Sequence, residues 1–282
     1  MINEYPQIDY PFAESLILPY IVAFIDERQD QLLLWPKELI RDHNDFINTL
    51  NRSVNNESIL NPFARVFSYQ KDYLNIYITY PSNAKEASSG RLGLHLTLGV
   101  LFHKNVFSNF IPCKYFMEYY LLKFEKIFNV DLDENGPTEF IEKLKNNNDY
   151  PVVCEKIKEL LSELLLSLFQ INKVKSYNFL DNLYSFFNRK NDKFLFPKVI
   201  FCSQNVGVRG TLLLFFSVID KYLQCRGRLK NLDFSTADGR LDKSVLIVPC
   251  LPNNMRLKID NDLSSLIAIT DITGKLIILK TK

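Results

Sequence analysis

The sequence has few cysteines, glycines and histidines for its length. Its 282 residues include five cysteines, nine glycines and three histidines. The cysteines are odd in number and at least 23 residues apart, which fits neither a disulfide framework nor paired CxxC metal knuckles. We therefore expect reduced, mostly buried cysteines. The three histidines, His43, His95 and His103, are too scattered to suggest a metal site or a catalytic base.

A long apolar run is also missing. None reaches the roughly 18 residues that span a bilayer, because Asp26, Glu163 and Asp220 interrupt the most apolar stretches. The first nine residues carry Glu4 and Asp9 but no basic side chain, unlike a secretory signal. We therefore expect a cytoplasmic chain without a membrane span.

What the chain has in abundance is apolar and aromatic bulk, with 47% hydrophobic residues, 22 Phe and 14 Tyr. This composition predicts a globular protein of one large domain or two ordinary ones. The formal net charge of +2 conceals an asymmetry between the two halves of the chain. Residues 1–150 hold 14 basic and 20 acidic side chains, whereas residues 151–282 hold 20 basic and 12 acidic ones. Such a division indicates either a surface for an acidic partner or two halves that attract each other.

Hydrophobic spacing predicts an ordered series of elements up to residue 170. Two apolar runs around a polar turn, 16–25 and 32–35, indicate a hairpin, and steps of three and four over 39–50 indicate a helix. Strands are expected at 64–69, 73–80 and 91–102. Three helices should follow, from Pro112 to Asn129, from Thr138 as the capping residue to Leu144, and over 152–170.

The strand expected over 91–102 has the clearest alternation. Leucines and a valine occupy one face, and the other face carries small or polar residues that include Thr97 and Gly99. Because that second face is nearly flat, we expect another group to pack closely against it.

The remaining residues predict a second, basic module. A helix is expected over 179–187 and another over 211–223. Strands are expected over 195–202, 244–250 and 255–259, and as a hairpin over 266–270 and 276–279. The predicted fold class is α+β, with an N-terminal module over 1–172 whose antiparallel five-stranded sheet is flanked by helices, followed by a mixed α/β module over 173–282.

The order strand, strand, helix, three strands and two helices over residues 16–170 resembles the longin and roadblock group of α/β sandwiches. That resemblance concerns topology and includes no diagnostic motif. It implies a five-stranded antiparallel sheet with one helix on one face and the others on the opposite face. It also implies a binding scaffold that serves GTPase regulation, trafficking or complex assembly.

One acidic segment matches the spacing of a calcium-binding loop. Counted from Asp131, it has oxygen ligands and a glycine at the positions of an EF-hand, although Pro137 is awkward at the seventh. The matching residues are Asp131, Asp133, Asn135, Gly136, Glu139 and Glu142. A solvated acidic linker is the alternative interpretation.

Basic residues in the C-terminal half could bind phosphate or nucleic acid. The loop 203–211 lies between an expected strand and an expected helix, so that Arg209 and Thr211 could hold a phosphate, although the glycine spacing is not that of a P-loop. A tight turn is the alternative. Arg226, Arg228 and Lys230 could meet nucleic acid phosphates, or form a solvated face.

These observations favour a non-catalytic adaptor or regulatory subunit that binds a partner protein in a complex, and a nucleotide-driven complex would suit such a role. No catalytic residues and no cofactor are implied, because the sequence lacks HExxH, a serine nucleophile elbow and a catalytic cysteine signature. The alternatives are a nucleic-acid-associated protein that uses the basic C-terminal half, and a degenerate hydrolase or nucleotide-binding enzyme over 195–249.

Overall fold

The structure is a computed structural model of residues 1–282. It describes residues 8–10, 17–26, 29–37, 39–51, 62–70, 72–84, 94–103, 113–146, 148–167, 199–202, 233–235, 246–249, 266–270 and 276–280, together with residues 209, 212 and 216. The predicted boundary between residues 172 and 173, the helix over 179–187 and the strand over 255–259 lie outside this part of the chain.

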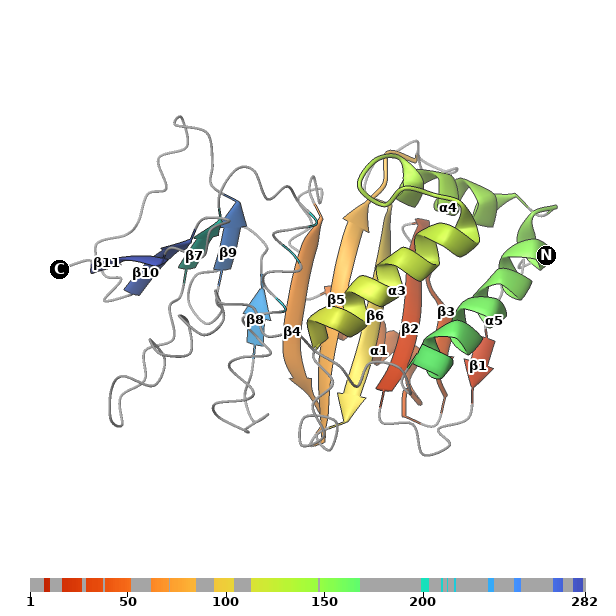
Figure 1. Ribbon diagram of the computed structural model, residues 1–282. Coiled ribbons are helices and arrows are strands. Elements are labelled where there is room, and N and C mark those ends of the chain that lie inside the picture. Colours follow the sequence, from red (N-terminus) through yellow and green to blue (C-terminus); the bar gives the residue numbers. More distant parts are fainter. Residues whose placement is uncertain are drawn as a thin grey trace.

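A seven-stranded sheet forms the centre of the N-terminal part (Figure 1). Its strand order is β1-β3-β2-β6-β5-β4-β8. The strands are β1 (Ile8–Tyr10), β2 (Ile17–Asp26), β3 (Gln29–Pro36), β4 (Phe63–Tyr69), β5 (Tyr73–Pro81), β6 (His95–His103) and β8 (Asp233–Ser235). The five central strands pair antiparallel, as the sequence predicts; in sheet order they are β3, β2, β6, β5 and β4. Two further strands, which the sequence did not predict, flank them: β1 pairs parallel with β3, and β8 pairs antiparallel with β4.

Helices cover both faces of this sheet. The helix α1 (His43–Asn51) lies behind the sheet in Figure 1, and α3 (Cys113–Phe128), α4 (Gly136–Lys145) and α5 (Tyr150–Ser167) lie in front of it. The aromatic rings of Tyr20 and Phe46 meet edge to face at 5.0 Å on the α1 side. On the opposite side Phe102 meets Phe116 of α3 at 5.5 Å. The α+β fold class predicted from the sequence is therefore confirmed.

The flat face of β6 accepts a close contact, as its alternation predicts. Gly99 lies opposite Tyr20 in the register of β6 and β2, and a Cβ atom at Gly99 would overlap the phenol ring of Tyr20. The Tyr20 hydroxyl donates a hydrogen bond to Asn75 Oδ1 at 2.7 Å, and both residues are fully buried. Glycine is thus required at position 99 by the space that the tyrosine ring occupies.

A hydrogen bond from α3 reaches the backbone of β2 beside a bulge in the pairing of β2 and β3. The register shifts between Ile21 and Val22. On the other side of the sheet, the hydroxyl of Tyr120 on α3 donates a hydrogen bond to the backbone carbonyl of Tyr20 at 3.0 Å. Both phenols are buried, so that removal from water raises the pKa of Tyr20 and of Tyr120.

Helix α4 begins two residues before the predicted cap. Asn135 occupies the N-cap position without a side-chain cap bond, and Pro137 lies in the first turn. Thr138 does not cap the helix. Its hydroxyl oxygen accepts the Asn83 N–H at 2.9 Å, because the end of β5 passes close to this end of α4. The expected capping role of Thr138 was therefore wrong, and the residue instead connects α4 to the sheet.

Residues from the C-terminal half contribute to the same core and the same sheet. Leu212 and Phe216 have helical backbone conformation, are buried and belong to the hydrophobic core of the N-terminal sandwich. With β8 at the sheet edge, two separate parts of the C-terminal half complete this sandwich.

A second sheet lies in the C-terminal half, with the strand order β11-β10-β7-β9. It consists of β7 (Val199–Cys202), β9 (Leu246–Pro249), β10 (Leu266–Thr270) and β11 (Leu276–Lys280). β7 pairs parallel with β9 and β10, and β10 pairs antiparallel with β11, which confirms the predicted terminal hairpin.

Candidate functional site

The connection between α3 and α4 forms a charged corner. Asn129 ends α3 with a left-handed backbone (φ 53°), a conformation that asparagine tolerates. The next residue, Val130, donates its N–H to the carbonyl of Glu125 at 3.1 Å. The chain then turns tightly, since the Asp131 carbonyl accepts the Gly136 N–H at 2.7 Å. A Cβ atom at Gly136 would overlap the backbone of Asp131, so that this turn requires glycine.

Arg209 inserts its guanidinium group between two carboxylates of this corner. Its NH1 and NH2 groups both donate to Glu125, the first to Oε2 at 3.0 Å and the second to Oε1. Its Nε lies 2.9 Å from Asp133 Oδ2. Glu125 also accepts the Leu132 N–H at 3.0 Å, which orients the carboxylate toward the guanidinium. A forked guanidinium on a carboxylate is among the strongest and most directional polar contacts in proteins.

The electrostatics of the corner depend on its partial burial. The side chains of Arg209 and Glu125 are 24% and 16% exposed, and Asp133 is 40% exposed. Burial raises the pKa of the Asp133 carboxyl, and Arg209 opposes that rise. The charges of Glu125 and Asp131 add to the rise.

Tyr80 lies at the bottom of the corner and is fully buried. Its hydroxyl has no hydrogen-bond partner among the described residues. Burial raises its pKa well above the usual tyrosine value, and its phenol interacts electrostatically with Arg209, Asp133 and Glu125. The corner therefore combines two carboxylates and a buried hydroxyl around one cation.

The predicted metal loop coincides with this corner. Asp133 faces Arg209, and Asp131 Oδ1 accepts the N–H of Asp133 at 2.9 Å. Glu142 lies on α4, where Lys145 pairs with it at 3.1 Å, and Asn135 precedes the helix. Within the described ranges no group of three histidine, cysteine or acidic residues is placed to hold a metal ion. Calcium binding stays a prediction.

The predicted phosphate and nucleic-acid residues are only partly described. Arg209 is the one whose side chain the structure places, and its three guanidinium nitrogens face Glu125 and Asp133. A phosphate at this guanidinium would have to compete with both carboxylates. Thr211, Arg226, Arg228 and Lys230 lie outside the described residues, so that their roles stay predictions.

Sequence patterns could not identify Glu125 as the partner of Arg209. Glu125 is 84 residues away and lies on an amphipathic helix on which any polar position looks alike. The only signal was the excess of acid in the first half and of base in the second. The Arg209 corner is one place where the halves neutralise each other.

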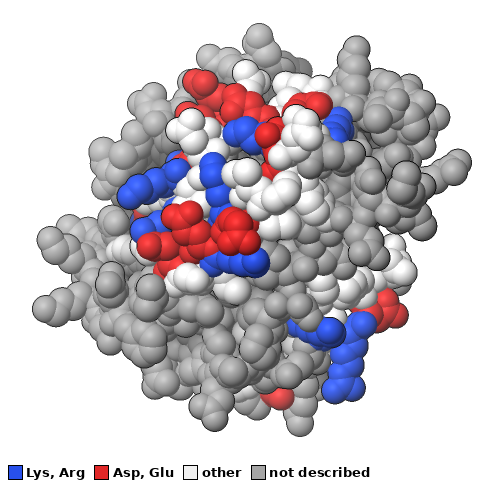
Figure 2. Space-filling view, turned by 90° about the vertical axis from the view of Figure 1, so that its right-hand side faces the viewer, with Lys and Arg blue, Asp and Glu red and all other residues white. Residues whose placement is uncertain are grey.

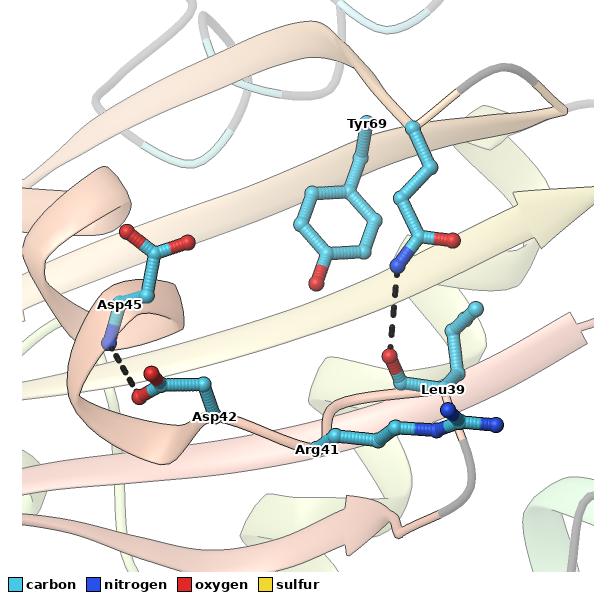
Figure 3. A pocket seen from close by; sticks show the side chains of 6 residues that line it. Leu39, Arg41, Asp42, Asp45 and Tyr69 are labelled. Carbon is cyan, nitrogen blue, oxygen red and sulfur yellow. Dashed lines mark hydrogen bonds between the residues drawn. The ribbon is translucent and has the colours of Figure 1, made fainter.

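An open cleft lies where α1 begins (Figure 3). It has a volume of about 500 Å³ and is lined by Leu39, Arg41, Asp42, Asp45, Tyr69 and Gln70. Asp42 caps α1, because its Oδ1 accepts the N–H of Asp45 at 2.9 Å. Figure 3 shows the Tyr69 ring between Asp45 and Leu39.

The far wall of the cleft comes from the turn between β4 and β5. Gln70 has a left-handed backbone (φ 52°) and donates from Nε2 to the carbonyl of Leu39 at 3.3 Å. Burial raises the pKa of the Tyr69 hydroxyl, which the Gln70 contact opposes and the charge of Asp45 reinforces. The exposed carboxylates of Asp42 and Asp45 outnumber the one exposed cation of the lining, Arg41, so that the cleft keeps a net acidic wall beside a phenol, which suits a cationic side chain.

The helical face seen in Figure 2 carries charges of both signs side by side. On α3, α4 and α5, three lysines pair with glutamates: Lys123 with Glu163 at 2.5 Å, Lys145 with Glu142 at 3.1 Å, and Lys158 with Glu155 at 2.7 Å. This face is therefore neither an acidic nor a basic patch.

Comparisons with known proteins add no assignment. No helix in the described part of the chain is long and apolar enough to cross a membrane. No protein-family model matches the chain, and a search of curated proteins finds no match to it either.

Proposed function

We propose that the protein is a non-catalytic subunit that binds a partner protein, with the N-terminal sandwich as the binding scaffold. The observation that carries this proposal is the architecture of the described residues: five antiparallel strands within a seven-stranded sheet, with α1 on one face and α3, α4 and α5 on the other. The five antiparallel strands and the helices on both faces agree with what the resemblance to the longin and roadblock group implies, whereas β1 and β8 extend the sheet beyond it. Because fold is a weaker argument than a site, the surface that binds the partner must be named and tested.

The cleft at the start of α1 is the surface that we assign to the partner. Its exposed Asp42 and Asp45 carboxylates and the half-buried Tyr69 ring would receive a lysine or arginine side chain. Leu39 offers an apolar contact beside them. Concave sites with a few converging polar groups are the usual places where proteins recognise ligands.

The test uses Asp45→Asn, because Asp45 lines the cleft through its side chain and only its backbone N–H takes part in the cap. The tagged full chain captures partners from lysate, and native mass spectrometry identifies those encoded by neighbouring genes. We expect Asp45→Asn to weaken the identified complex about tenfold, the loss typical of one charged contact. Glu159→Asn on the exposed side of α5 is the control and should leave binding unchanged. Equal binding of the partner by both variants would exclude this cleft. A chain that remains monomeric when mixed with each protein encoded by a neighbouring gene would contradict the proposed function.

A further inference from the structure

We propose that the corner between α3 and α4 is a guanidinium-recognition site, which the chain fills with its own Arg209 and from which an arginine-bearing segment of a partner protein can displace it. The proposal rests on the proposed function only for the identity of the displacing partner. The recognition site itself is tested without any partner.

The chemistry of the corner fits a guanidinium better than any other cation. Glu125 receives two nitrogens in a fork, and Asp133 lies beside the third. A lysine ammonium could not reach both carboxylates with the same geometry, because it is a single point of charge. The planar guanidinium donates to Glu125 from its two terminal nitrogens, while its Nε forms an ion pair with Asp133.

The buried hydroxyl of Tyr80 is independent support for a built site. It is fully buried, lacks a hydrogen-bond partner among the described residues and interacts electrostatically with the three charged groups. Buried polar groups without partners are rare in folded proteins and usually have a functional explanation. Without Arg209, two partly buried carboxylates would lie near this hydroxyl with no cation to neutralise them.

The polar anchor of this segment is more accessible than its apolar part. Arg209, Leu212 and Phe216 have helical backbone conformation and are spaced by three and four residues, the spacing by which a helix presents one face to a groove. Leu212 and Phe216 enter the apolar core, and Arg209 supplies the polar anchor. Because Arg209 and Asp133 are 24% and 40% exposed, solvent and a competing cation can reach the anchor.

The experiment is a chemical rescue of the full-length Arg209→Ala variant by methylguanidinium. The truncation leaves Glu125 and Asp133 without their cation, and we expect native-state proteolysis to become about ten times faster. Methylguanidinium should reverse this effect with a saturable dependence at millimolar concentration. Methylammonium and sodium chloride at equal ionic strength should restore less than half of the protection, because neither reproduces the fork.

In the wild-type chain the same reagent should give no protection, because Arg209 already fills the corner. The tethered Arg209 has a high effective concentration there, so that 50 mM methylguanidinium should change the cleavage rate by less than about twofold. Lys123→Ala is the control, because it removes a paired lysine of α3 that is as exposed as Arg209, and it should respond as the wild type does. Protection of Arg209→Ala without protection of the wild type or of Lys123→Ala separates occupancy of the corner from a general effect of the reagent on stability.

A second variant shows where the rescue acts. Glu125→Gln combined with Arg209→Ala should abolish it, because the forked acceptor is lost. If Arg209→Ala does not fold, Arg209→Gln replaces it in the same series. The proposal would be overturned if sodium chloride protected Arg209→Ala as well as methylguanidinium does. It would also be overturned if methylguanidinium still protected the variant that combines Glu125→Gln with Arg209→Ala. A positive rescue together with an unaffected Asp45→Asn complex would refute the cleft and leave the guanidinium site standing.

Discussion

The contact between Gly99 and Tyr20 gives the sharpest test of the fold. Gly99→Ala places a Cβ atom inside the volume of the Tyr20 phenol ring, in a core where Tyr20 is fully buried. Overpacking of this kind costs about 1–3 kcal/mol. If the ring moves, its hydrogen bond to Asn75 is also lost, which costs about 1–3 kcal/mol more because the Asn75 amide is buried.

The expected loss of unfolding free energy is therefore about 2–6 kcal/mol, a large part of the roughly 5–15 kcal/mol of a typical domain. Urea unfolding measures it through the fluorescence of Trp35, the only tryptophan, which is buried and contacts His43 at the start of α1. Tyr20→Leu removes the ring and should make the added cost of Gly99→Ala small, so that the two changes are not additive. A loss below about 1 kcal/mol, or an equal loss in the Tyr20→Leu background, would refute the reasoning.

Two further predictions concern the buried tyrosines and the contribution of the C-terminal half. Burial raises the pKa of Tyr20, Tyr80 and Tyr120. The folded state therefore keeps these three protons above about pH 10, where the unfolded chain loses them. The free energy of unfolding should be intact below that pH and should fall above it by up to about 1.4 kcal/mol per pH unit for each tyrosine. Absorbance at 295 nm should show part of the tyrosinate appearing only with unfolding, and full titration in the folded chain would contradict their burial. Phe216→Ala should cost about 3–5 kcal/mol in urea unfolding, whereas Leu122→Ala, at a 54% exposed position, should change stability by no more than about 0.5 kcal/mol. A small effect at Phe216 would mean that the second half does not complete the core of the first.

Local patterns were sufficient where packing follows from periodicity. The alternation around Leu96 and Leu98 predicted β6, and the steps of three and four through Leu160 and Leu164 predicted α5. Element ends were less accurate, because tertiary contacts decide them. Thr138 has the chemistry of a cap, but the end of β5 lies close enough to take its hydroxyl.

The candidate sites were predictable only as residue types. Arg209 and Asp133 were both chosen from the sequence, but for different ligands, a phosphate and a metal ion. In the structure they face each other, and Glu125 joins them. The cleft at the start of α1 was not predicted, since its walls come from two loops that only the sheet brings together.

The sequence by itself determined the five antiparallel strands and the helices between residues 17 and 167, the flat face of β6 and the opposed charges of the two halves, because these depend on neighbours along the chain. Only the tertiary structure decided that β8 joins β4 and that Leu212 and Phe216 complete the core. It also decided that the guanidinium of Arg209 meets Glu125. Contacts across 84 residues depend on the path of the whole backbone, and a helix or strand pattern does not record which distant charge will arrive beside it.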